Sequence, residues 1–344
     1  MEWTEPGVFE VAPGVNRIPL PLPNDGLHTV NAYALDDGDG LVLIDSGWAL
    51  ADGEAALEAA LGALGHGFED VRRFLVTHIH RDHYTLAVAL RRRFGTKVAL
   101  GAGEQPSLAK VIARTRDGQV RNLAAWGAPH LAERWRTVVA AVGEDELRDY
   151  EEPDEWLDGS DLVLEKRTLR VLPTPGHTRG HVVFVDVDSS LLFAGDHVLP
   201  HITPSIGFEP ARPALPLGDY LDSLRLVRDF PDLRLLPAHG PVTESSHARV
   251  DELLAHHEDR LAATLDAVRA GAGTAFETAR ALGWTRRNRA FAELDLFNQV
   301  LATAETAAHL DVLVHRGLLT TGDAGGVTVY SVPAGERRPG TGEG

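Results

Sequence analysis

Short apolar runs separated by turn residues predict β-structure over residues 8–48. The runs cover residues 8–12, 15–20, 28–35 and 40–45, and Pro, Gly, Asn and Asp lie between them. The segment 36–40 alternates Asp with Gly and predicts a hairpin turn between the last two runs.

Helical and strand-like segments then alternate along residues 49–237. Apolar residues at helical spacing predict helices over 49–64, 84–94 and 218–230, and residues 107–142 also look helical because strand alternation is missing there. Apolar runs predict strands at 74–76, 162–165, 169–172, 181–187, 191–194 and 233–237. The acidic stretch 144–155 is interpreted as a solvated loop.

After about residue 248 the pattern becomes mainly helical. Apolar spacing predicts three helices, over 250–268, 274–282 and 291–314, with Gly317 in the C-terminal cap position of the third. The segment 318–330 then predicts a hairpin. Three helices and a hairpin follow the order of a winged-helix module. Residues 334–344, rich in Gly, Pro, Glu and Arg, predict a disordered tail.

Composition narrows the class of protein. Of the 344 residues, 44% are hydrophobic and 24% are charged, which excludes a disordered or fibrous chain. The net charge of −17 disfavours non-specific nucleic-acid binding. The chain has no Cys, which excludes disulfides and thiol nucleophiles and fits the cytoplasm. We expect neither a signal peptide nor a membrane span, because no suitable apolar run occurs.

Candidate metal ligands cluster between residues 78 and 83. His78, His80, Asp82 and His83 follow a predicted strand. In an extended segment side chains alternate, so His78, His80 and Asp82 would share one side and His83 would face a second ion. A segment this short cannot complete two sites, so other strand ends must supply the remaining ligands. Three candidates lie in turns after apolar strands: His177, Asp196 and His239.

The run His78-Ile79-His80-Arg81-Asp82-His83 resembles the HxHxDH signature of the metallo-β-lactamase-fold hydrolase superfamily. Downstream, His177, Asp196 and His239 match the remaining ligand positions of that superfamily in order, and Asp45-Ser46-Gly47 resembles its early Asp-x-Gly turn. The resemblance covers roughly residues 8–245. The C-terminal segment is similar to the winged-helix-like extension of one subgroup.

This resemblance implies an α/β fold, namely a four-layer αβ/βα sandwich with a two-metal site at one edge and a small winged-helix-like α+β domain. We therefore expect a catalytic domain at 1–247, a winged-helix-like domain at 248–333 and a disordered tail at 334–344.

The resemblance also implies a role for each candidate ligand. The first ion would be held by His78, His80 and His177, the second by Asp82, His83 and His239, and Asp196 would bridge them. Nitrogen and oxygen donors fit two divalent ions, Zn²⁺ best, with Fe or Mn as alternatives. Five neutral imidazoles and two carboxylates leave the loaded site positively charged, which favours a bound hydroxide.

Three further residues are given supporting roles. Asp45 is expected to orient the metal loop, as a carboxylate behind a metal-binding His does. Asp82 is also a candidate catalytic proton shuttle, and His201, on the loop after Asp196, is a candidate substrate contact. His181, His197 and Tyr84 are interpreted as structural. The pair His256-His257 is placed on an exposed helix face.

The leading hypothesis is metal-dependent hydrolysis of an acyl bond, a thioester or ester of a small molecule, by a metal-bridging hydroxide. No Gly-x-Ser-x-Gly motif offers an alternative nucleophile. The alternatives are a lactonase or β-lactamase-like ring hydrolase, a phosphodiesterase or ribonuclease of the same fold, and a non-catalytic metal sensor.

Charge argues against a nucleic-acid partner. Residues 248–333 carry eight Arg and eleven Asp or Glu, a net charge of −3, and so lack the basic stripe of a nucleic-acid-binding module. The C-terminal segment is therefore expected to act as a lid or as a contact in a homodimer.

Overall fold

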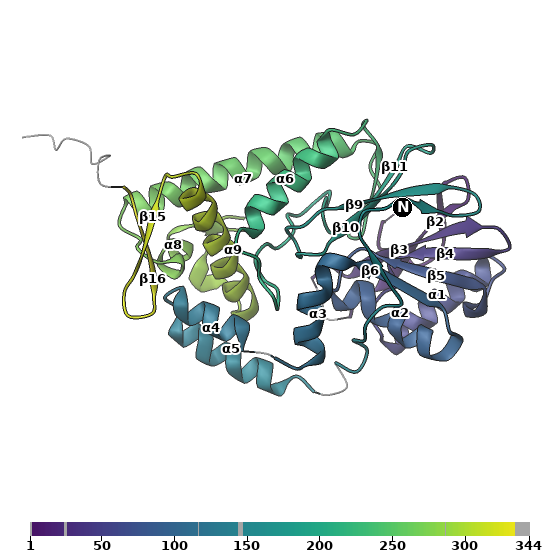
Figure 1. The fold of residues 1–344 in the computed structure, drawn as a ribbon, viewed down its shortest axis with the longest axis horizontal. Helices are drawn as coiled ribbons and strands as arrows, with labels where there is room; N and C mark the ends of the chain where they lie inside the picture. The colour runs from purple at the N-terminus through teal and green to yellow at the C-terminus, as the bar shows by residue number, and fades with distance from the viewer. Residues whose placement is uncertain (1, 24–25, 116, 144–146, 286, 334–344) are drawn as a thin grey trace, which may run out of the picture.

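The computed structural model describes residues 2–23, 26–115, 117–143, 147–285 and 287–333 (Figure 1). Two main β-sheets pack against each other, and helices cover the outer face of each. The fold is therefore the predicted αβ/βα sandwich. The predicted tail at 334–344 lies outside the described residues.

The first main sheet has seven strands in sequence order, β1 to β7. Strands β1 to β4 are antiparallel, and β4 to β7 are parallel. Their bounds are β1 Phe9–Ala12, β2 Val15–Pro21, β3 Thr29–Asp37, β4 Gly40–Ile44, β5 Val71–Val76, β6 Lys97–Gly101 and β7 Glu155–Leu157. The structure confirms the predicted β-structure over residues 8–48, including the β3–β4 hairpin.

The second main sheet has five strands in the order β12-β11-β10-β9-β8. Strands β8 to β11 are antiparallel, and β12 is parallel to β11. Their bounds are β8 Leu162–Val163, β9 Thr168–Pro173, β10 Val182–Asp186, β11 Leu191–Gly195 and β12 Arg234–Pro237. All five strands were predicted from their apolar runs.

The hydrophobic core has three layers, one between the two sheets and one between each sheet and its helices. Alternate side chains of the central strands belong to different layers. In β10, Phe184 packs between the two sheets, whereas Val183 packs on the helical side. In β5, Leu75 lies between the sheets and Phe74 faces the helices of the other side. Both faces of these strands are buried, which explains why they read as continuous apolar runs rather than as alternating ones.

Six helices connect the strands of the two sheets. They are α1 Ala51–Ala63, α2 Arg81–Phe94, α3 Gln105–Ile112, α4 Gly118–Ala125, α5 Pro129–Ala141 and α6 Pro216–Arg228. The helical prediction for 107–142 corresponds to three helices, α3 to α5. The last break comes at Gly127, whose φ of +85° suits glycine, and Pro129 then opens α5.

The predicted order of C-terminal elements, three helices and then a hairpin, is confirmed. The helices are α7 Ser246–Arg269, α8 Ala275–Ala281 and α9 Leu296–His315, and the strands are β15 Thr320–Asp323 and β16 Thr328–Ser331. A short strand pair, β13 Gly283–Trp284 and β14 Arg289–Ala290, lies between α8 and α9. Helix α9 begins later than predicted, because 291–293 forms a separate 3-10 turn.

The C-terminal helices share a hydrophobic core with the second sheet. One cluster contains Val183 of β10 and Leu224 of α6 together with Leu253 of α7 and Leu310 of α9. The boundary between residues 247 and 248 stays a prediction, and α7 begins at Ser246. Within the described ranges, no helix is long and apolar enough to cross a membrane.

Candidate metal centre

Five of the seven candidate ligands lie on loops that meet at one edge of the sandwich, and Asp82 and His83 lie in the first turn of α2 at the same edge. These loops follow β5, β9, β11 and β12. One backbone hydrogen bond crosses between the two sheets, from the amide of Val182 to the carbonyl of Thr77 at 2.8 Å. Another connects two strand ends within the second sheet, from the amide of Ala238 to the carbonyl of Gly195 at 3.0 Å. Residues far apart in sequence therefore reach one place because their strands end there.

The expected alternation along residues 78–83 stops where α2 begins. Because α2 starts at Arg81, Asp82 lies in its first turn rather than in an extended segment. The prediction that His78, His80 and Asp82 share one side is wrong for Asp82, which lies instead with His83 and His239. The helical turn, rather than strand alternation, therefore divides the motif between two groups.

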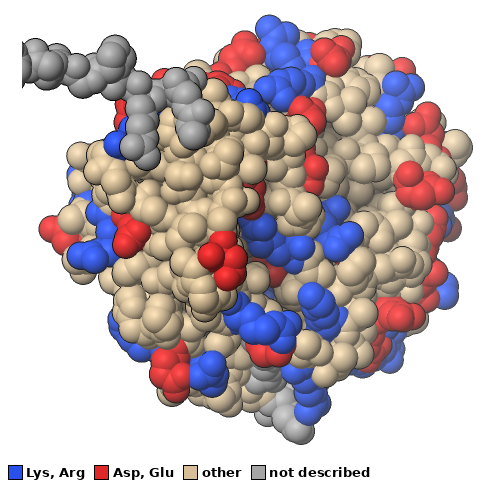
Figure 2. All heavy atoms as spheres, turned by 60° about the vertical axis from the view of Figure 1, so that its left-hand side comes forward, with Lys and Arg blue, Asp and Glu red and all other residues tan. Residues whose placement is uncertain are grey.

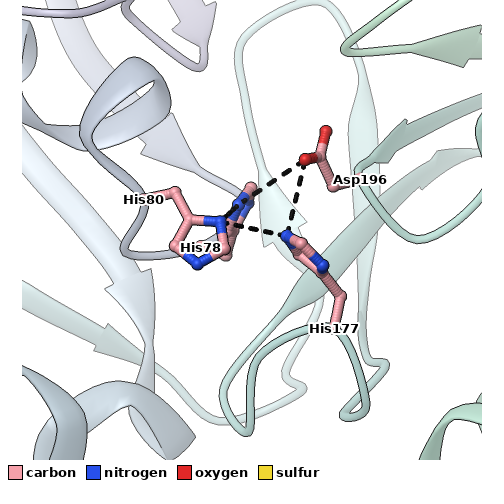
Figure 3. Close-up of side chains that lie close together, drawn as sticks. All are labelled: His78, His80, His177 and Asp196. Atoms are coloured by element: carbon pink, nitrogen blue, oxygen red, sulfur yellow. Dashed lines mark hydrogen bonds and ion pairs between the residues drawn. The ribbon is translucent and has the colours of Figure 1, made fainter. Parts of the chain in front are cut away.

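The first group brings together His78, His80, His177 and Asp196 (Figure 3). The Nδ1 atom of His80 lies 2.9 Å from His78 Nε2 and 3.0 Å from His177 Nε2. The Oδ2 atom of Asp196 lies 3.4 Å from His177 Nε2 and 4.0 Å from His78 Nε2. Ligands of a tetrahedral Zn²⁺ with bonds of about 2.0 Å are about 3.3 Å apart, so this spacing fits an ion.

The second group contains Asp82, His83 and His239, and the other oxygen of Asp196 completes it. Asp82 Oδ2 lies 3.6 Å from His83 Nε2 and 3.4 Å from His239 Nε2. Asp196 Oδ1 lies 3.7 Å and 3.4 Å from the same two nitrogens. Each oxygen of Asp196 therefore faces a different group, an arrangement that allows one carboxylate to serve both.

Hydrogen bonds from the opposite ring nitrogens orient three of the imidazoles. His83 Nδ1 donates to Asp45 Oδ2 at 2.9 Å, His177 Nδ1 to the carbonyl of Ser205 at 2.8 Å, and His239 Nδ1 to the carbonyl of Thr29 at 2.8 Å. Each bond leaves the Nε2 lone pair directed into the site, as in metal-binding histidines generally. The expected position of Asp45 behind the metal loop agrees with this contact.

Asp45 also holds the end of β5. Its Oδ1 accepts hydrogen bonds from the amide of Thr77 at 2.8 Å and from Thr77 Oγ1 at 3.0 Å. Asp45 itself has a φ of +59°, which a non-glycine residue adopts only at a cost. Asp45, a residue with a strained backbone, thus holds both the strand end before His78 and the ring of His83.

Three polar atoms in this site are buried without a hydrogen-bond partner in the described part of the chain: His83 Nε2, His239 Nε2 and Asp196 Oδ1. Such buried polar atoms are rare in folded proteins, because an unpaired buried group is costly. All three face the centre of the second group. The donor set therefore fits a divalent cation there, which would satisfy these three atoms together.

Burial and charge give the two groups different protonation behaviour. Burial lowers the pKa of His80 to about 3 and that of His177 to about 4, so both imidazoles are neutral at pH 7. Burial also opposes charge on His83, but Asp82 and Asp45 beside it raise the pKa of His83 to about 10. The carboxylates thus favour a positive charge in the second group. A metal ion and a proton therefore compete for His83 Nε2.

The remaining candidate residues lie around the site or away from it. His201 is exposed on the loop after Asp196, and its ring lies beside Gly240, the residue after His239. His181 is buried and its Nε2 accepts from the amide of Asp196 at 3.1 Å. His197 is also buried, and Tyr84 donates to the carbonyl of Glu151 at 2.6 Å.

The exposed placement of the pair His256-His257 is wrong for His257. His256 is exposed, but the ring of its neighbour His257 is fully buried. It packs against Tyr220 of α6 and His309 of α9. Neighbouring residues on a helix point about 100° apart, so a His-His pair at the edge of an apolar face can divide between core and solvent.

Sequence reasoning gave no role to two residues that support the site. Thr77 holds Asp45 through both its amide and its hydroxyl. Glu104 is fully buried, and its carboxylate contacts two of the ligand loops. Neither residue carries a local signal, because their partners are distant in sequence.

Comparison with known proteins extends these observations. Residues 25–239 match the sequence profile of the metallo-beta-lactamase superfamily. A lactamase-like protein of Aspergillus fumigatus is 26% identical over 235 residues, which is 68% of this chain and 55% of that protein. The chain thus spans about half the length of that relative.

Two solved structures are similar over almost all of the chain. A metallo-beta-lactamase family protein of Thermus thermophilus is 29% identical, with a TM-score of 0.77 and coverage of 94% of this chain and 100% of its own. A beta-lactamase domain protein of Burkholderia ambifaria is 27% identical, with a TM-score of 0.78 and coverage of 94% of both chains. From the fold, the grouped side chains and the profile match together, we conclude that this chain belongs to the metallo-beta-lactamase superfamily.

Proposed function

We propose that this protein is a hydrolase that binds two divalent metal ions in the two groups and cleaves an acyl bond, a thioester or an ester, of a small molecule. Members of the superfamily are generally hydrolases. The proposal rests above all on Asp196, whose two oxygens face different groups. Its Oδ2 lies near His177, and its Oδ1 lies near His83 and His239. Two separate single-ion sites would not need a shared carboxylate.

The chemistry of the donors favours Zn²⁺, with Fe or Mn as alternatives, because imidazole and carboxylate suit all three. Two such ions would lower the pKa of a shared water and polarise a carbonyl oxygen. Within the chain itself, Asp45 and the carbonyl groups of Ser205 and Thr29 keep the imidazoles in one tautomer.

Asp82 is proposed as the residue that moves a proton during hydrolysis. Its Oδ2 faces both His83 and His239, and its side chain is only 16% exposed. A carboxylate in this position can take a proton from the attacking water and return it to the leaving group. His201, exposed beside the turn that carries His239, is proposed to contact substrate.

An acyl substrate agrees with the surface better than a polynucleotide does. The net charge is −17, and on the face in Figure 2 the Lys and Arg side chains are interspersed with Asp and Glu. Continuous positive charge is the usual footprint of a nucleic-acid site. The C-terminal segment, which shares its core with the second sheet, is proposed as a lid or homodimer contact.

Metal analysis combined with a substrate screen tests this proposal. We expect two divalent ions per chain and turnover of at least one compound among acyl-CoA, acyl-glutathione, aryl ester, lactone and β-lactam substrates. A chelator should abolish the activity, and added metal should restore it. Turnover that survives complete metal removal would contradict the proposal.

Substitution provides the matched control. His80→Ala should reduce turnover by a factor of about a hundred or more, because His80 Nδ1 sits between two other ligand nitrogens. His315→Ala removes an exposed imidazole at the end of α9 and should leave turnover unchanged. Equal activity of the two variants would count against the assignment.

A further inference from the structure

A buried carboxylate lies behind the first group of ligands. Glu104 ends the 3-10 turn Ala102–Glu104, which follows β6 directly, and its side chain is fully buried. The backbone of this turn touches the loop after His177: a Cβ on Gly103 would lie 2.7 Å from the carbonyl oxygen of Arg179, and one on Gly180 would lie 2.0 Å from the amide of Glu104. The two segments pack this closely because glycine has no Cβ.

One oxygen of Glu104 contacts both loops that carry the histidines of the first group. Oε1 accepts a hydrogen bond from the amide of Ile79, at 3.3 Å, and another from the hydroxyl of Thr178. Ile79 stands between His78 and His80, and Thr178 follows His177 directly. A single acceptor atom therefore connects the segments that supply all three histidines of this group.

A second buried carboxyl extends the contact. Glu209 Oε2 accepts from the amide of Arg179 at 3.1 Å and from Ser107 Oγ at 3.2 Å. Glu209 is 2% exposed and belongs to the same loop as Ser205, whose carbonyl accepts from His177. Two neighbouring carboxyls thus hold the His177 loop, one from the 3-10 turn before α3 and one from the loop before α6.

The two buried carboxyl groups indicate that Glu104 acts by accepting hydrogen bonds and not only by filling space. Burial raises the pKa of Glu104 to about 7, and burial together with the neighbouring Glu104 raises the pKa of Glu209 to about 8. An apolar side chain would fill the same space without this desolvation cost. What an apolar side chain could not provide is an acceptor for the amide of Ile79 and the hydroxyl of Thr178.

We propose that Glu104 is a positioning residue: it joins the 78–80 loop to the 177–180 loop and so sets the spacing of the three nitrogens of the first group. This inference rests on the proposed metal-binding function. Glu104 does not reach the second group through these contacts, so its effect should be confined to the first.

Substitutions at Glu104 separate an acceptor role from simple filling of space. Glu104→Gln keeps an oxygen at the position of Oε1, whereas Glu104→Leu keeps the volume and removes both hydrogen bonds. Thr178→Val removes one of the two donors and leaves Glu104 intact. Thr303→Val is the matched control, because Thr303 is equally buried in α9 and its hydroxyl donates to the carbonyl of Gln299, away from the site.

Co²⁺ affinity is measured by competition with a chromophoric chelator in two backgrounds. His239→Ala leaves the first group intact, and His80→Ala leaves the second group intact. In the His239→Ala background, Glu104→Leu should weaken binding at least tenfold, Thr178→Val should weaken it less, and Glu104→Gln and Thr303→Val should stay within threefold. In the His80→Ala background, none of these changes should exceed threefold.

Amide exchange of the metal-free protein gives a second measurement. The amide of Ile79 should exchange slowly in the parent protein and in Glu104→Gln, and at least tenfold faster in Glu104→Leu. If Glu104→Leu does not fold, Thr178→Val carries the test. The inference would be overturned if Glu104→Leu left both the Co²⁺ affinity of the first group and the exchange rate of Ile79 unchanged. It would also be overturned if Glu104→Leu weakened Co²⁺ binding equally at both groups.

The two proposals fail in different ways. If the parent protein binds no metal in these groups, the proposed function fails, and the exchange of Ile79 still decides whether Glu104 joins the loops. If the parent protein binds two ions and Glu104→Leu binds them equally well, the role of Glu104 fails while the proposed function stands.

Discussion

Among single residues, Asp45 has the most specific task. Its Oδ1 accepts from Thr77, and its Oδ2 accepts from Nδ1 of His83 at 2.9 Å. The second bond keeps the proton of a neutral His83 on Nδ1 and leaves the Nε2 lone pair free for a ligand. The orientation of His83 therefore depends on an oxygen at that position rather than on the bulk of the side chain.

Asp45→Asn tests this dependence. An amide can still accept from Thr77, but its NH₂ group cannot accept from Nδ1 of His83, so the imidazole proton should move to Nε2. We expect affinity for the second ion to fall by roughly 10- to 100-fold while affinity for the first stays unchanged, as measured by stepwise metal titration.

Asp188→Asn, at an exposed turn after β10, provides the control for Asp45→Asn. It should leave both affinities unchanged. Asp45→Asn with normal affinity for the second ion would show that the bond from His83 to Asp45 does not control the orientation of that imidazole.

At the residue scale, the sequence predicts the candidate ligands but not all of the residues that hold them in place. The seven candidate ligands were identified because four lie in one short motif and three follow apolar strands in Gly-containing turns. Glu104 was not identified, because a lone Glu after Gly103 has no local pattern and its partners are 25 and 74 positions away. Long-range hydrogen bonds of this kind leave no mark in the local sequence.

At the scale of elements, many strands were predicted from their apolar runs, but two strands of the first main sheet, β6 and β7, were not predicted. β6 has only three consecutive apolar residues, Val98 to Leu100, and β7 is a three-residue edge strand that begins at the last residue of the predicted acidic loop. Both pair in parallel with a strand distant in sequence. Pairing of that kind depends on the tertiary fold and leaves a weak local signal.

Helices α7 and α9 meet through a pair of buried histidines. His257 Nδ1 lies 3.3 Å from His309 Nε2, and His309 Nδ1 donates to the carbonyl of Glu305 at 2.8 Å. Burial lowers the pKa of His309 to about 4, below the unfolded value of 6.5. The unfolded chain therefore binds the extra proton, and the stability that His309 contributes above pH 6.5 is lost as the pH falls towards 4.

His309→Gln tests this dependence on pH. A shift of this size corresponds to about 3 kcal/mol, so the free energy of unfolding of the metal-free parent protein should fall by about that much more than that of His309→Gln between pH 7 and pH 4. Urea titrations at both pH values measure the difference. Parallel curves for parent and variant would contradict the burial of a neutral His309.

The whole molecule is organised around a core that both parts of the chain share. Val183 of the second sheet and Leu224 of α6 belong to the same cluster as Leu253 and Leu310 of the C-terminal helices. The sequence correctly indicated a change of pattern near residue 248, because amphipathic helices replace strands there. It could not show that these helices cover the second sheet, since an apolar stripe does not identify what it packs against.

Truncation after residue 245 tests this shared core. Without α7 to α9, the apolar faces of α6 and of the second sheet would be exposed to water, and a contiguous patch of that kind favours aggregation. We expect the truncated chain to be insoluble or to bind a hydrophobic dye strongly. A soluble fragment with a single cooperative unfolding transition would instead support an independent domain at 1–247.

We propose that seven side chains hold two ions and that Asp196 bridges them. Anomalous diffraction from crystals of the zinc-loaded protein, recorded on both sides of the zinc absorption edge, tests it most directly. The account predicts two peaks, one among His78, His80 and His177 and one among Asp82, His83 and His239, each within bonding distance of a different oxygen of Asp196. No peak at these positions, or peaks that do not touch Asp196, would contradict it.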